Sequence, residues 1–204
     1  MRIATLSTIA SEIASMLSLM HNKRIAYKII TQNDFCVMIG LCVEPNRFTP
    51  SDFSVRYFVQ ALYLPSSVID LSLGDVIGEW EKQNLSVALS AIQKCFKQHF
   101  GDVNSIHTII DQVSNSKLPF FGSLDNKYEF FAYSYLAINK YDCAIDYLNK
   151  LASLENDDNA IWYDDQIKRV KKIVNLIKRG SWNEIKSELI NWQNNTIKAL
   201  HLSS

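Results

Sequence analysis

The stretch Tyr128–Leu154, YEFFAYSYLAINKYDCAIDYLNKLASL, decides the fold of the C-terminal half of the chain. We interpret it as two helices joined by a tight turn. The small Ala144 lets the two helices approach closely, and Tyr135 and Leu148 fill their crossing. A pair of this kind cannot bury its apolar face alone, so it requires further helices stacked against it.

The pattern around Tyr141, Tyr-Asp-x-Ala-Ile-x-Tyr-Leu-x-Lys, resembles the second helix of a tetratricopeptide-type hairpin. A weaker copy, GSWNEI, follows at residues 180–185, with Trp182 in the position of Tyr141. The chain departs from the family at Phe131, where leucine is usual. The resemblance implies tetratricopeptide-like hairpins across 126–199 and a role in contacts with other proteins rather than in chemistry.

Apolar residues at helical spacing predict more helices on either side of this pair. Asn84 is placed to cap a helix over 85–100, and a second stripe, containing Ile106 and Ile110, predicts a helix over 102–114. Because about three hairpins are needed to stabilise one another, we expect a helical half that covers 81–204. The predicted hairpins are 85–114, 126–154 and 159–199.

In the first third of the chain, apolar and polar residues alternate with the two-residue period of a β-strand. Arg24–Thr31 and Phe35–Val43 predict a hairpin around the turn Gln32-Asn33-Asp34, and we expect both strands to share one apolar face. Two more strands are predicted, and no strand beyond Gly74. A helix precedes them, capped by Ser7. We therefore predict an α+β fold, with a helix and a small, about four-stranded antiparallel sheet in 1–80, followed by the helical half; the two could form one continuous unit. The apolar face of the predicted first helix carries Ile9, Ile13, Met16, Leu17 and Met20. The two further predicted strands are Phe53–Leu64 and Val68–Leu73.

A linker with Pro119 and Gly122 separates the predicted helices, and we expect its Phe120 and Phe121 to dock onto the sheet or the helices. The order of a leading helix, an antiparallel sheet, amphipathic helices and then Lys117-Leu118-Pro119-Phe120-Phe121 resembles the bacterial domain-of-unknown-function family numbered 4304. That family has no established activity. The resemblance therefore implies a bacterial cytoplasmic protein and transfers no functional residue.

Composition narrows the classes of partner. Lys plus Arg and Asp plus Glu both number 21, so the chain has no net charge to attract nucleic acid or an anionic membrane. No apolar stretch is long enough for a membrane-spanning helix, and Glu12 interrupts the segment that could pass for a secretory signal. The four cysteines lack paired spacing, which predicts buried free thiols in a reducing cytosol. The oligomeric state stays open.

Motifs of catalysis and of metal or cofactor binding are absent from the sequence. The six glycines form no phosphate-binding loop, and the four histidines show no ligand spacing. Cys36 and Cys42 share one strand face but are separated by about 20 Å, so we expect packing there rather than a bond. We predict no catalytic residue, no metal and no cofactor.

One segment concentrates charge. Acids occupy 155–165, and bases without acids occupy 168–179. This order complements a helix macrodipole, which is a sufficient structural explanation. The functional alternative is a basic patch for an acidic protein partner, made of Lys168, Arg169, Lys171 and Lys172. Nucleic acid is disfavoured because no aromatic side chains are interleaved with the bases. The acids are Glu155, Asp157, Asp158, Asp164 and Asp165.

Two functions follow from these observations. We expect a protein-protein interaction module rather than an enzyme, and an inhibitor or immunity-type protein against a bacterial toxin is one form that such a module takes. The alternative is a small-ligand-binding protein or an enzyme with a cleft between the sheet unit and the helices. The aromatic residues that would line that cleft are Tyr57, Phe58, Tyr63, Phe120 and Phe121.

Overall fold

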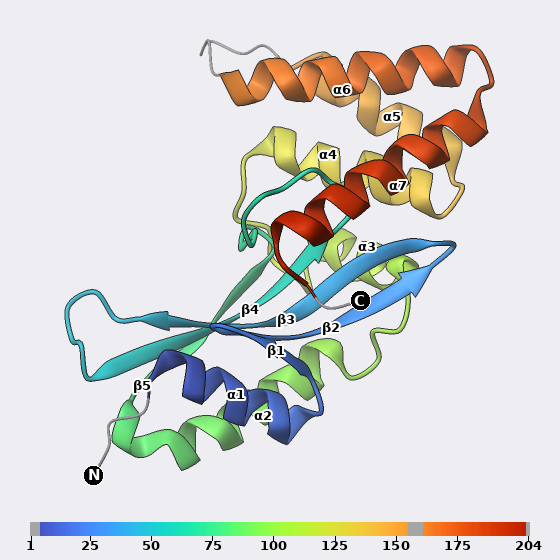
Figure 1. The fold of residues 1–204 in the computed structure, drawn as a ribbon. Helices are drawn as coiled ribbons and strands as arrows, with labels where there is room; N and C mark the ends of the chain where they lie inside the picture. The colour runs from blue at the N-terminus through green and yellow to red at the C-terminus, as the bar shows by residue number, and fades with distance from the viewer. Residues whose placement is uncertain (1–4, 155–160, 203–204) are drawn as a thin grey trace.

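An antiparallel sheet forms the centre of the structure, with helices on both of its faces (Figure 1). The computed structural model describes residues 5–154 and 161–202. The strands, in their order across the sheet, are β1 (Met20–Asn22), β2 (Ile25–Gln32), β3 (Phe35–Pro45), β4 (Asp52–Ala61) and β5 (Gly74–Glu81). The helices are α1 (Leu6–Leu17), the short 3-10 turn η1 (Lys82–Asn84), α2 (Leu85–Phe100), α3 (Ile106–Ser114), α4 (Leu124–Ala137), α5 (Tyr141–Ala152), α6 (Ile161–Lys178) and α7 (Trp182–Ala199). The predicted α+β class is confirmed.

The β2–β3 hairpin forms where the sequence predicts it. Its turn is Asn33-Asp34, with φ of 53° and 75°, and these two residue types tolerate the left-handed backbone that a two-residue hairpin turn needs. The turn places Tyr27 opposite Gly40. A β-carbon on Gly40 would lie 2.9 Å from the β-carbon of Tyr27, so the position requires glycine.

This register corrects the predicted face of β2. Because Gln32 pairs with Phe35, odd-numbered residues of β2 lie across from even-numbered residues of β3. Tyr27 therefore shares a face with Met38, and Ala26 shares the other face with Leu41. The expectation that Ile25, Tyr27 and Ile29 share the face of Phe35, Val37, Ile39, Leu41 and Val43 is wrong.

The last strand also differs from the prediction. Residues 68–73 form no strand, although Leu73 makes one isolated bridge with Phe120. The fifth strand begins at Gly74, beyond the point where the sequence predicts strands to end. A short strand, β1, is also added at the opposite edge. The sheet thus has five strands rather than about four.

The two faces of the sheet pack differently. One face, through Ile39 and Val55, joins a large apolar core that includes α1, α2 and the later helices. The other face, through Tyr27 and Phe58, packs against the end of the chain, where Leu200 lies in a smaller apolar cluster. The Asn22 side-chain amide donates to the carbonyl oxygens of Leu200 and His201 and so holds this segment against the sheet edge.

Helix caps only partly follow the prediction. Thr5, and not Ser7, caps α1: its hydroxyl accepts from the Thr8 backbone N–H at 3.1 Å. Met20 lies in β1 and is exposed rather than on the apolar face of α1. Asn84 occupies the N-cap position of α2 but makes no capping hydrogen bond with its side chain.

Helices α4 and α5 form the predicted hairpin, and α6 packs on α5 and α7. Ala144 is fully buried, and so is Leu148, whereas Tyr135 is half-buried and stacks on Tyr147. The rings of Tyr141 and Trp182 stack at 4.1 Å between centroids, so the two similar turns meet directly. Helix α2 packs chiefly on β5 and α1, and α3 on β2 and α4.

The linker before α4 docks through only one of its two phenylalanines. Phe120 packs against the large core, as predicted. Phe121 is 62% exposed, which contradicts the prediction. Its backbone N–H donates to Ser72 at 2.6 Å, so the backbone docks while the side chain points to solvent.

Replacing Ala144 by phenylalanine should lower the free energy of unfolding by about 1–3 kcal/mol, because the α4–α5 crossing has no room for a larger side chain. Ala152→Phe on the same helix is the matched control, since Ala152 is exposed. Urea denaturation of both variants measures the difference. Equal stability of the two variants would contradict the close packing of this hairpin.

Candidate functional site

The bases predicted to bind a partner lie on α6. Lys168, Lys171 and Lys172 are exposed. Two of them form ion pairs within the molecule: Lys168 with Asp165 at 3.1 Å and Lys172 with Glu188 at 2.7 Å. Lys171 has no ion pair within the described part of the chain. The solvent-facing patch is therefore weaker in net charge than the sequence indicates.

Arg169 points into the protein instead. Its guanidinium donates to Oε1 of Glu129 through Nη2 at 2.8 Å and through Nε at 3.2 Å. Gln166 donates to the other Glu129 oxygen at 2.9 Å. Glu129 is only 7% exposed, so this network ties α6 to α4. Of the preceding acids, Glu155, Asp157 and Asp158 lie outside the described residues, whereas Asp164 and Asp165 are exposed.

More buried polar atoms surround this network. Tyr133 follows Glu129 by one helical turn, and its pKa is raised by burial and then by the Glu129 charge, with Arg169 opposing. Its hydroxyl has no hydrogen-bond partner among residues 5–154 and 161–202, and neither do Asp125 Oδ2 and Gln166 Oε1. Each such group costs about 1–3 kcal/mol. The α4–α6 junction is therefore a polar and costly part of the core.

The aromatic residues proposed to line a cleft are mainly core residues. Tyr57, Phe58 and Tyr63 are buried, and Phe58 belongs to the opposite face of the sheet from the other two. The Tyr63 hydroxyl is hydrogen bonded to Ser134 at 2.8 Å, and burial raises its pKa above the usual range. A pocket of about 290 Å³ does lie between β4, the 64–73 segment and α4, but Phe120 is the single member of the predicted set that lines it.

Burial holds the thiols of Cys42 and Cys95 and the hydroxyl of Tyr57 in their neutral forms. Burial, followed by the Glu44 charge, raises the pKa of Cys42 to about 11, and burial followed by Asp75 raises the pKa of Tyr57 to about 12. Burial also raises the pKa of Cys95. These thiols are poor nucleophiles at neutral pH. All four cysteines are free, as predicted, but only Cys42 is buried, and Cys143 is exposed.

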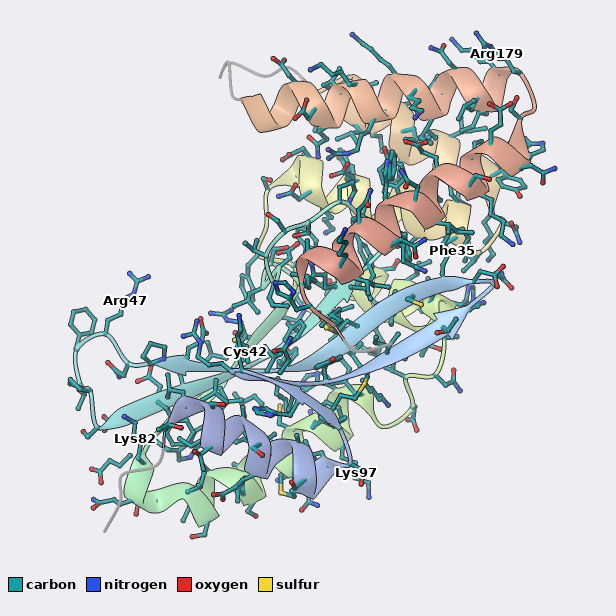
Figure 2. All side chains as sticks on the ribbon, in the orientation of Figure 1. Phe35, Cys42, Arg47, Lys82, Lys97 and Arg179 are labelled. Atoms are coloured by element: carbon teal, nitrogen blue, oxygen red, sulfur yellow. The ribbon has the colours of Figure 1, made fainter. Side chains whose placement is uncertain are left out.

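The most exposed large apolar side chain of the described residues is Phe48, at 94%. It lies in the loop 46–51 between β3 and β4. Figure 2 shows its neighbour Arg47 projecting into solvent from the end of the loop between β3 and β4. The segment Glu44–Asp52, EPNRFTPSD, is polar and contains two prolines, so the sequence by itself predicts a loop here and nothing more. The signal that could have indicated more is a phenylalanine within an otherwise polar segment between Pro45 and Pro50.

Loop 46–51 has a defined conformation in spite of its exposure. The side-chain oxygen of Asn46 accepts from the backbone N–H groups of Phe48 at 2.9 Å and Thr49 at 3.1 Å, which is an Asx turn. The Asp52 N–H then donates to the Thr49 carbonyl at 2.9 Å. Hydrogen bonds therefore hold Asn46, Thr49 and the Phe48 backbone N–H, while the Phe48 ring stays in solvent.

Contacts from β5 and from η1, which follows it, hold the other side of the loop. Lys82 donates through Nζ to the Pro50 carbonyl at 2.6 Å and through its backbone N–H to Ser51 at 3.0 Å. Asn46 also donates to Glu79 at 3.2 Å. Figure 2 places Lys82 at the same end of the sheet as Arg47. Loop 46–51 is thus braced by β5 and η1.

Comparisons with known proteins found no matching family model, no similar curated protein and no similar solved structure. Among the described residues, no helix combines the length and apolar character that crossing a bilayer requires. The candidate site therefore rests on the geometry of loop 46–51 and its surroundings.

Proposed function

We propose that the protein is a protein-protein interaction module and that loop 46–51 contacts the partner, with Phe48 as the anchor. The observation that carries this proposal is a phenylalanine that is 94% exposed on a loop held by hydrogen bonds along its length. A single exposed apolar side chain is common on protein surfaces. The combination with a braced backbone is what favours binding.

The energetics support this role for the loop. Burying a phenylalanine side chain in a partner's pocket contributes about 1.5–3 kcal/mol. A loop that already has its bound conformation loses little entropy on association. Arginine is enriched among the residues that dominate interfaces, and Arg47 lies directly beside the anchor. A rigid loop of this kind also suits an inhibitor or immunity-type protein that plugs the cleft of its target.

The surrounding charge favours a protein partner over a lipid surface. At this end of the sheet the acids Asp52, Glu79 and Glu81 outnumber the bases Arg47 and Lys82, so its net negative charge would be repelled by anionic lipids. The paired helices α4–α7 and their resemblance to tetratricopeptide hairpins also support a protein-binding role. In this proposal the exposed Lys168, Lys171 and Lys172 form a second, weaker contact surface.

Photo-crosslinking in the native host tests the proposal. Phe48 is replaced by the photoreactive residue benzoylphenylalanine, and the exposed Phe121 is replaced in the same way as the control. We expect one protein to cross-link at position 48 and not at 121. Excess purified wild-type protein should compete for this product, and the Phe48→Ser variant should not. The same products at both positions, or equal competition by both proteins, would overturn the proposal.

A further inference from the structure

Strand β5 is an edge of the sheet. It pairs with β4 on one side, and no strand lies on its other side within the described residues. The Val76 N–H donates to the side chain of its own neighbour, Asp75, at 2.7 Å, rather than to another strand. Val76 is 38% exposed. An edge whose backbone groups are not paired with a strand is able to accept one.

The charge of β5 restricts what could pair with it. The strand carries Asp75, Glu79 and Glu81 and no basic residue, and the two glutamates are exposed. Two copies of β5 placed edge to edge would bring carboxylates against carboxylates, which destabilises a strand pair. These acids therefore protect the edge from self-association. They also favour a strand that carries lysine or arginine.

The position of β5 links it to loop 46–51. Glu79 accepts from Asn46, so the acidic edge and the Phe48 anchor belong to one end of the molecule. β5 has 8 residues, a length of about 26 Å at the usual rise per residue. Gly74, the first residue of β5, already donates its N–H to the Pro119 carbonyl. An extended segment could follow the edge from Asp75 to Glu81 while a neighbouring part of the same partner takes up Phe48.

We propose that the open edge of β5 binds an extended, lysine- or arginine-rich segment of the partner protein as a sixth strand of the sheet. This inference rests on the proposed function and names the chemistry of the partner. Backbone hydrogen bonds along the edge hold the segment, and Asp75, Glu79 and Glu81 select for its positive charge.

A synthetic octapeptide of alternating lysine and valine, with blocked ends, tests strand addition directly. Its control has the same sequence and charge but is N-methylated at every second residue, so one of its edges cannot donate hydrogen bonds. We expect calorimetry to show binding of the first peptide and at least about tenfold weaker binding of the second. Amide hydrogen exchange should slow in β5 on binding the first peptide.

Protein variants locate the site. The double variant Glu79→Gln/Glu81→Gln removes two charges but keeps a side-chain oxygen at position 79 that can accept from Asn46. It should weaken binding of the first peptide by about tenfold. Glu184→Gln, an exposed acid on α7, is the matched control and should change nothing. Equal binding of both peptides, equal effects of the two variants, or dimerisation of the free protein through β5 would each overturn the inference. If position 48 still captures a partner, the proposed function stands without it.

Discussion

Replacing Gly74 by alanine should lower the free energy of unfolding by about 4 kcal/mol, the largest stability effect that we expect from a single substitution. Gly74 has φ of 148°, a conformation that residues with a side chain rarely adopt. A β-carbon there would collide with the carbonyl oxygen of Tyr57 and lie 2.8 Å from its carbonyl carbon. Both atoms belong to the backbone of β4, so neither can move without disturbing the sheet.

Gly74 is also the first residue of β5. The Gly74 N–H donates to the Pro119 carbonyl at 3.0 Å, next to the bridge between Leu73 and Phe120. The substitution should therefore also expose the amides of β5 to faster hydrogen exchange. Gly180→Ala is the control: its φ is 66°, but a β-carbon there would meet no heavy atom within 4 Å, so we expect a loss of about 1 kcal/mol. Equal losses in urea denaturation would contradict the described packing of β5.

The second large effect concerns the α4–α6 junction. Arg169→Met should destabilise the protein by about 3 kcal/mol, because it leaves the buried Glu129 carboxylate without its cationic partner. Lys168→Met is the control on the same helix. The Lys168 side chain is 75% exposed in its pair with Asp165, so its loss should cost less than about 0.5 kcal/mol.

A double variant separates the charge from the packing. Glu129→Leu/Arg169→Met removes both charged groups, and we expect it to recover most of the stability that Arg169→Met loses. Differential scanning calorimetry at neutral pH measures all three variants. If Arg169→Met and Lys168→Met melt together, Arg169 does not hold α6 to α4 as described.

The parts of the fold that the sequence predicts are those fixed by local chemistry. Asn33-Asp34 determines the β2–β3 turn, and Ala144 marks the crossing of α4 and α5. The sequence does not predict β5, because Gly74 and Gly78 break its alternation. This strand pairs with a single neighbour, so few of its side chains carry the apolar pattern of a central strand.

Two features that the sequence does not predict depend on contacts between distant segments: the pairing of Arg169 with Glu129 and the conformation of loop 46–51. Helical periodicity places Arg169 among the bases of α6, but its partner, Glu129, lies on α4 and carries no local signal. The same limit applies to loop 46–51. Its sequence shows turn residues, whereas the bracing by Lys82 and Glu79 comes from η1 and from β5, a strand that the sequence pattern does not predict.

The affinity of the protein captured at position 48, measured by calorimetry with purified components, tests the central claim most directly. Phe48→Ser should weaken binding by at least about 30-fold without changing the melting temperature, because a buried aromatic anchor contributes about 2 kcal/mol or more. The triple variant Lys168→Gln/Lys171→Gln/Lys172→Gln should stay within about threefold of wild type. Unchanged binding by Phe48→Ser together with a large loss in the triple variant would contradict the account and place the interface on α6.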